Sequence, residues 1–205
     1  MVERIRSETE ARTRILEAAW DMIVRRGLSD SSMAVIAKSA GVSRQAVYLH
    51  FGSRAGLLVA MARHHDSTSG LLARIVAVRE QAPPSELLEA YFASWLDYMR
   101  EIFPVARLLS VASVTDPEAA LAWNDRMEEL RAGIAQVMRT LKNAGLLAEG
   151  WSIHEATDWA WSQTHVDAWR HLVDERGWES ERAKSRILAS LRTSLLAAGN
   201  EPNRP

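Results

Sequence analysis

Apolar residues recur at every third or fourth position along most of this chain, the spacing that places them on one face of an α-helix. In the clearest run, successive apolar residues are four, three, four, three and four positions apart: Trp123, Met127, Leu130, Ile134, Val137 and Leu141. We find no pair of alternating segments joined by a hairpin turn, as paired strands would require. The pattern therefore predicts an all-α fold of about nine helices.

Serines that can cap a helix and glycines that can end one divide the first part of the chain. Ser7 and Glu10 have the spacing of a capping box for the first helix. The sequence Ser69-Gly70 is a weak point inside the fourth. The four helices predicted here cover residues 7–27, 32–41, 43–50 and 53–78.

Prolines and further caps divide the rest. Pro104 is expected to end a helix, because proline lacks the amide hydrogen of a helix interior. Ser152 and Glu155 form a second candidate capping box. The predicted helices cover residues 86–102, 105–112 (a short segment), 116–145, 152–173 and 180–197.

The segment from Ser32 to Arg54 bears most directly on function. It contains two short helices with a turn at Gly41, and on the second helix Val47 points towards the first. An outward arc of the second helix holds Arg44, Gln45, Tyr48 and Leu49. Arginine pairs with guanine and glutamine with adenine in the major groove, whereas tyrosine and histidine donate to phosphate. The layout is that of a helix-turn-helix, and the alternative is an ordinary helical hairpin with a solvated polar face.

Four short motifs in this region resemble the DNA-binding signature of the tetracycline-repressor (TetR) family: Gly41-Val42-Ser43, Tyr48-x-His50-Phe51, Ser53-Arg54 and Leu57-Leu58. The match runs from about Thr13 to Leu58, and the remaining chain resembles the family in length and helical character only. The resemblance implies a homodimer that binds a palindromic operator and responds to a small molecule. The predicted DNA-binding residues are Ser32, Ser43, Arg44, Gln45, Tyr48, His50 and Arg54.

Charge and composition support this prediction modestly. Of the 205 residues, 1–55 contain nine Lys and Arg against six Asp and Glu, a net charge of +3, whereas the rest contain 16 against 20, a net charge of −4. A basic head on an acidic body favours contact of the head with a polyanion. Cysteine is absent, which excludes disulfides and thiolate zinc sites. The charged N-terminus and the lack of a long apolar run predict a cytoplasmic protein with no membrane partner.

We expect a DNA-binding domain at residues 1–54 and a ligand-binding and dimerisation domain at residues 55–205. Seven of the eight tryptophans lie in the second region, where the resemblance implies a ligand cavity. Its candidate wall residues are Trp95, Tyr98, Met99, Trp123, Met127, Trp161 and His165. Such a wall favours planar, hydrophobic or cationic effectors, with Asp97 or Asp158 as a possible counter-charge. The alternatives are a tryptophan-filled core, a core histidine and solvated surface acids.

Two C-terminal helices have more apolar surface than one core contact needs, which suits a two-fold four-helix interface. The residues predicted for this interface are Trp159, Val166, Trp169, Ile187, Leu188, Leu191 and Leu195. The alternative is that they form an intramolecular core.

Two other classes of protein are alternatives to a regulator. An enzyme or metal protein is disfavoured, because the neighbours His64 and His65 diverge by about 100° on a helix and no phosphate loop or zinc-ligand spacing occurs. No cofactor and no metal are predicted. A helical module whose head binds protein is the second class, and salt dependence distinguishes it from a DNA-binding head. The predicted function is a ligand-responsive transcriptional regulator, with repression as the expected mode.

Overall fold

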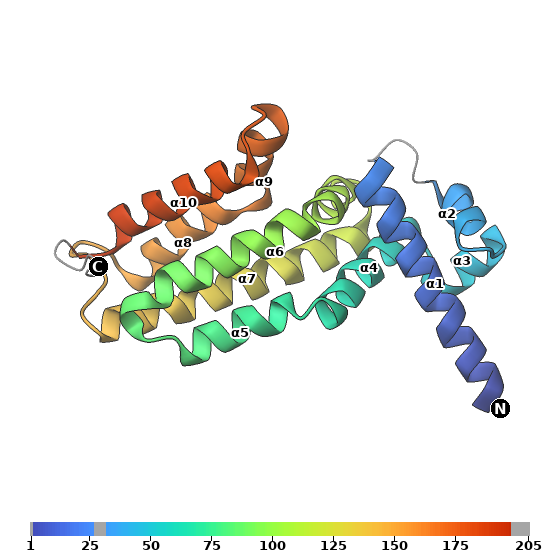
Figure 1. Cartoon of the computed structure of the whole chain (residues 1–205), viewed down its shortest axis with the longest axis horizontal. Coiled ribbons are helices and arrows are strands. Elements are labelled where there is room, and N and C mark those ends of the chain that lie inside the picture. The colour runs from blue at the N-terminus through green and yellow to red at the C-terminus, as the bar shows by residue number, and fades with distance from the viewer. Residues whose placement is uncertain (1, 27–31, 198–205) are drawn as a thin grey trace. The chain divides into compact units, whose positions relative to one another are not determined.

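The computed structural model describes residues 2–26 and 32–197 (Figure 1). Nearly all of them are helical, so the prediction of an all-α fold is confirmed. The β-type pairing that occurs within these two ranges is an isolated antiparallel bridge between Leu147 and Leu196. The helices are α1 (Val2–Arg26), α2 (Met33–Ser39), α3 (Arg44–Phe51), α4 (Arg54–Thr68), α5 (Leu71–Gln81), α6 (Pro84–Ala112), α7 (Pro117–Asn143), α8 (Ile153–Thr164), α9 (Val166–Trp169) and α10 (Ser180–Leu195), with a π-helical turn, η1 (Arg170–Glu175), after α9.

Helix α6 runs through the proline that was expected to end it. Pro104 lies inside α6, so the predicted break and the separate segment 105–112 are wrong. Proline in a helix interior costs about 3 kcal/mol. Ile102, Val105 and Leu109 are at most 3% exposed. Burial of these three side chains offsets the cost of the proline, because each contributes roughly 1.5–3 kcal/mol.

Three further boundaries differ from the prediction. Gly70 adopts a left-handed φ of 69°, which splits the predicted fourth helix into α4 and α5. Helix α1 begins at Val2, so Ser7 is not its N-cap. The extended backbone of His165 ends α8 early, so the chain continues as α9 and η1. The structure thus has ten α-helices among the described residues, against the nine predicted.

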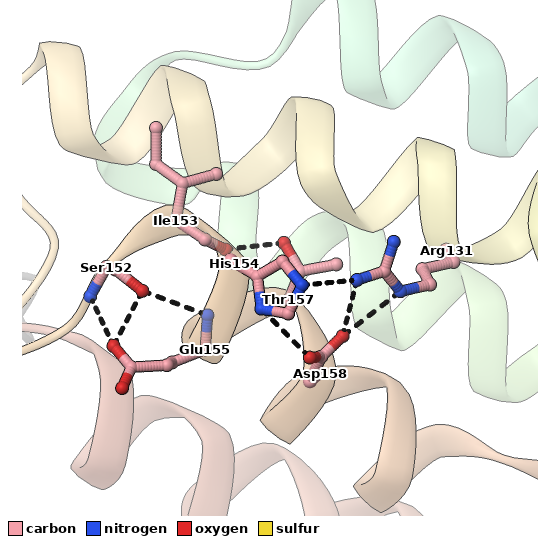
Figure 2. Close-up of polar contacts among 7 residues, drawn as sticks. All are labelled: Arg131, Ser152, Ile153, His154, Glu155, Thr157 and Asp158. Carbon is pink, nitrogen blue, oxygen red and sulfur yellow. Dashed lines mark hydrogen bonds and ion pairs between the residues drawn. The ribbon is translucent and has the colours of Figure 1, made fainter.

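The capping box at the start of α8 is confirmed. The Ser152 hydroxyl accepts a hydrogen bond from the Glu155 amide at 3.1 Å, and the Ser152 amide donates to the Glu155 carboxylate at 3.1 Å (Figure 2). The Ser152 hydroxyl also donates to the Glu155 carboxylate at 2.6 Å, and this bond, together with the one from the Ser152 amide, holds the pKa of Glu155 below its ordinary value. Two amides of the first turn are thereby satisfied, which fixes where α8 begins.

The chain forms two compact units. The head unit comprises residues 1–69 and 102–124, and the body unit comprises residues 70–101 and 125–205. The head unit is built on apolar side chains of α1 to α4: Ile15, Leu16, Ile23, Ile36, Val47, Leu57 and Leu58. In the body unit, α8 packs on α10 (Figure 1). The predicted domain boundary between residues 54 and 55, at the end of the helix-turn-helix, stays a prediction.

Candidate nucleic-acid interface

Helix α2 and the turn after it are fixed by local signals. The Ser32 hydroxyl accepts a hydrogen bond from the Val35 amide at 3.3 Å and so caps α2. Ile36 and Ala37 are buried against the rest of the head unit. Gly41 then adopts a φ of 67°, which residues with a β-carbon rarely adopt. The chain reverses direction here and continues into α3.

Helix α3 has one buried side and one exposed side. Ser43 caps it by accepting from the Ala46 amide at 3.1 Å. Val47 and Phe51, one turn apart, are 0% and 7% exposed. The opposite side is open to solvent and contains Arg44, Gln45, Tyr48 and Leu49. The predicted outward arc is therefore the exposed surface of α3, at the place that a recognition helix occupies in a helix-turn-helix.

Arg44 and Tyr48 interact with each other on this surface. The Arg44 guanidinium carbon lies 5.5 Å from the centroid of the Tyr48 ring, and Nη2 donates to the Tyr48 hydroxyl at 3.4 Å. Arg44 and Tyr48 are one helical turn apart, the spacing at which side chains of a helix meet. The tyrosine hydroxyl accepts in this pair, so it can still donate to a phosphate.

The end of α3 is joined tightly to α4. Gly52, with a φ of 70°, donates from its amide to the Tyr48 carbonyl at 2.8 Å. Ser53 accepts from the Gly56 amide at 2.9 Å and donates to the Glu118 carboxylate at 2.8 Å. Ser53 therefore caps α4 and also ties it to the start of α7. Sequence reasoning missed Glu118, because it lies 65 residues away along the chain.

The other predicted DNA-binding residues lie at the ends of these helices. The capping hydroxyls of Ser32 and Ser43 use a lone pair for the cap, so each can still donate its hydrogen to phosphate. His50 is half-buried in the last turn of α3, with its ring 6.0 Å from that of Phe51. Arg54 is exposed in the first turn of α4. Contact of these residues with DNA stays a prediction.

Three of the predicted effector residues are buried on α6. Trp95, Tyr98 and Met99 are at most 8% exposed. The Trp95 indole donates to the Thr164 carbonyl at 3.0 Å, and its ring lies 5.4 Å from that of Tyr98. The Tyr98 hydroxyl accepts from Arg126 at 2.7 Å. These aromatic side chains join α6 to α7 and α8 in the body unit.

The remaining effector candidates are divided between the two units. The Trp161 and His165 rings lie 4.7 Å apart in the body unit. Burial lowers the pKa of His165 below 6.5, and the Asp167 carboxylate opposes this effect. Met127 is half-buried in the body unit, whereas Trp123 falls in the head unit.

Both acids considered as counter-charges for a cationic effector have cationic partners. Asp97 binds the Lys184 ammonium at 2.5 Å and lies 3.6 Å from Arg74. Figure 2 shows the second cluster, in which Asp158 accepts from Arg131 at 2.8 and 3.0 Å and pairs with His154. Neither is a simple solvated surface acid, and neither presents an uncompensated charge.

Most of the residues predicted for the dimer interface are buried within one chain. Val166, Trp169, Ile187, Leu191 and Leu195 are at most 5% exposed. Of the other two, Trp159 is 38% exposed, and Leu188 is half-buried. Five of the seven side chains are thus part of the intramolecular core. Only Trp159 and Leu188 of this set are accessible to a partner subunit.

Within the described ranges, no group of three or more His, Asp or Glu side chains is placed to hold a metal ion. Over the same residues, each helix is too short or too polar to traverse a lipid bilayer.

The arrangement of α2 and α3, capped and packed on α1 and α4, defines a helix-turn-helix head. Residues 15–61 match the family model of bacterial regulatory proteins, tetR family. This match lies within the helix-turn-helix head, between α1 and α4, and the proteins that the model describes are bacterial regulatory proteins.

Two curated relatives match different shares of the chain. The regulator TtgR of Pseudomonas putida is 36% identical over 85 residues, which are 41% of this chain and 40% of that protein. The chain thus spans about two fifths of the length of that relative in the alignment. The repressor BepR of Brucella suis is 25% identical over 94% of this chain and 95% of its own.

Solved structures extend the likeness in fold to more than nine tenths of the chain. A Saccharomonospora viridis protein assigned as a transcriptional regulator, in complex with choline, has a TM-score of 0.74 at 20% identity and covers 92% of this chain and 98% of its own. SmeT in complex with triclosan has a TM-score of 0.71 at 15% identity and covers 95% and 96%.

Proposed function

We propose that the chain is a homodimeric transcriptional repressor that binds a palindromic operator and releases it when a small molecule occupies the body unit. The observation that carries this proposal is the exposed surface of α3. Arg44, Gln45 and Tyr48 lie opposite the buried Val47 and Phe51, so the polar side chains project from a helix whose other side is fixed in the core.

Arg44 and Gln45 lie in the first turn of α3, the part of a recognition helix that meets base edges. They read the operator sequence. Ser32, Tyr48 and Arg54 donate to phosphates on either side and fix the register, as does His50. Two heads related by two-fold symmetry enter successive major grooves about 34–36 Å apart, which makes the operator palindromic.

The effector binds among the aromatic side chains of the body unit. The proteins of similar fold include one solved with choline and one solved with triclosan, an organic cation and a neutral aromatic. Here Asp97 and Asp158 are paired with cations of the chain, so the ring faces of Trp95 and Trp161 provide the recognition. The effector can weaken operator binding only by as much as it prefers the released conformation.

Selection from a random duplex pool, followed by titration of the enriched sequence, tests the proposal. We expect enrichment of a palindrome and an affinity that falls log-linearly with salt as phosphate contacts release counterions. Arg44→Ala is expected to relax the preference at one base position of each half-site. No preference among duplexes at low salt would contradict the proposal, and a salt-insensitive complex with a protein would identify the head as an interaction module.

A further inference from the structure

We propose that a groove in the head unit, between α1 and α4, binds a small organic cation that contains an aromatic ring. The groove has a volume of about 650 Å³ and is lined from both helices, by Leu16, Glu17, Trp20 and Asp21 on α1 and by Met61 and His65 on α4. This volume is in the range of small-molecule sites. The groove is separate from the effector site proposed in the body unit.

The floor and one wall of the groove are apolar or aromatic. Leu16 and Met61 are each 1% exposed and form its base. The rings of Trp20 and His65 are stacked, with centroids 4.2 Å apart and planes 9° from parallel. A planar ligand can lie against this pair, because offset stacking on an indole or imidazole stabilises aromatic rings.

The rim of the groove is acidic on the α1 side. Glu17 and Asp21 are exposed and one helical turn apart, with Trp20 beside them on the same helix. The α4 side contributes His64 and Thr68, which carry no negative charge. The lining thus contains two carboxylates and no lysine or arginine. Carboxylates beside an indole favour a cationic ring over a neutral or anionic one.

A bound cation would join the two helices that support α3. Helix α4 follows α3 through Gly52 and Ser53, and α1 packs on both α2 and α4. A ligand that contacts Trp20 and Met61 together therefore favours one angle between α1 and α4. Its occupancy acts on the head without involving the body unit.

N-methylquinolinium, a planar cation, and quinoline, its uncharged parent, are the probes. Each is titrated into the full chain with its tryptophans labelled with ¹⁵N, at mildly alkaline pH, and the indole resonances are followed. Trp20→Phe identifies the Trp20 resonance, and calorimetry gives the affinity. We expect N-methylquinolinium to shift the Trp20 resonance and to bind roughly fivefold or more tightly than quinoline.

The charge-removal variant is Glu17→Gln with Asp21→Asn. We expect it to weaken the binding of N-methylquinolinium roughly fivefold. The matched control is Glu128→Gln with Glu129→Gln, which removes two exposed acids from α7 and is expected to leave the affinity unchanged. Circular dichroism verifies that each variant is folded.

Three results would each overturn the proposal: no binding of N-methylquinolinium, shifts confined to other tryptophans, or equal affinity in the charge-removal variant and the control. None of these measurements involves DNA, so failure here is distinct from failure of the proposed regulatory function.

Discussion

Gly56 in the first turn of α4 lies directly against the backbone carbonyl of Phe51 at the end of α3. A β-carbon on Gly56 would come within 2.1 Å of that carbonyl oxygen. Because the contact is with backbone and not with a flexible side chain, it cannot relax by a change of rotamer. Glycine at this position therefore sets how closely the proposed recognition helix packs against the helix that follows it.

Gly56→Ala is expected to destabilise the head unit by roughly 1–3 kcal/mol, the cost of forcing atoms into a packed contact. Urea unfolding followed by circular dichroism measures this loss. The sign of the change in the free energy of unfolding is decisive, because Gly→Ala in a helix without such a contact stabilises the fold by about 0.5–1 kcal/mol. An unchanged or increased free energy of unfolding would show that α3 and α4 are not held this closely.

The helix-turn-helix was predictable from sequence because its signals are local. The caps Ser32 and Ser43 act on amides three residues away, and Gly41 sets its own backbone angle. Gly56 and Glu118 carry no such signal. Gly56 is required by the preceding helix, and Glu118 meets Ser53 across 65 residues of sequence.

Errors of prediction outside the helix-turn-helix have the same origin. Pro104 disfavours a helix locally, but burial of Val105 and Leu109 around it keeps α6 intact. The apolar residues of α10 were predicted to form a dimer interface, because periodicity cannot distinguish a core partner in the same chain from a partner subunit. Leu191, at 0% exposure, contacts its own chain.

Arg44 and Tyr48 should act on DNA as a coupled pair. Arg44→Ala is expected to reduce affinity for the selected duplex by about 1–3 kcal/mol, the value of a bidentate base contact. Tyr48→Phe is expected to weaken all duplexes alike, because it removes a phosphate donor. The Arg44 guanidinium contacts the Tyr48 ring and hydroxyl. The loss of binding free energy in the double variant should therefore differ from the sum of the losses in the two single variants. Fluorescence anisotropy measures all three variants.

The control for this cycle is Arg63→Ala, which removes an exposed positive charge from α4 instead of α3. It should leave base preference unchanged. A uniform loss across duplexes for Arg44→Ala would show that Arg44 contacts phosphate only, and additivity within error would show that the pair separates on DNA.

Tyr91 is expected to make the fold sensitive to alkali. Burial raises the pKa of Tyr91 to about 12, although Arg79 lowers it in part. The unfolded chain loses this proton near pH 10, so between about pH 10 and 12 the folded state binds more protons and stability falls as pH rises. The loss from this group reaches roughly 2–3 kcal/mol at the upper end.

Urea unfolding at several alkaline pH values measures this dependence. Tyr91→Phe should flatten the alkaline loss, whereas Tyr48→Phe, which changes a tyrosine that is 39% exposed, should not. If Tyr91→Phe and the unchanged chain lost stability in parallel, the Tyr91 hydroxyl would have to ionise as readily in the folded state as in the unfolded one.

Two substitutions separate the subunit interface from the core of the body unit. Leu191 is fully buried in one chain, so Leu191→Asp is expected to cost roughly 3 kcal/mol or more and to unfold the body unit. Trp159 is 38% exposed on α8, with its ring 6.2 Å from that of Trp151. Trp159→Asp should therefore keep the helical content and weaken self-association, because it places a charge in an apolar interface.

Sedimentation measures the mass, and circular dichroism measures the folded fraction. Val114→Asp, at a side chain 82% exposed in the head unit, is the matched control and should leave both unchanged. A folded Trp159→Asp chain that sediments as the unchanged protein does would place the interface elsewhere than on this face of α8.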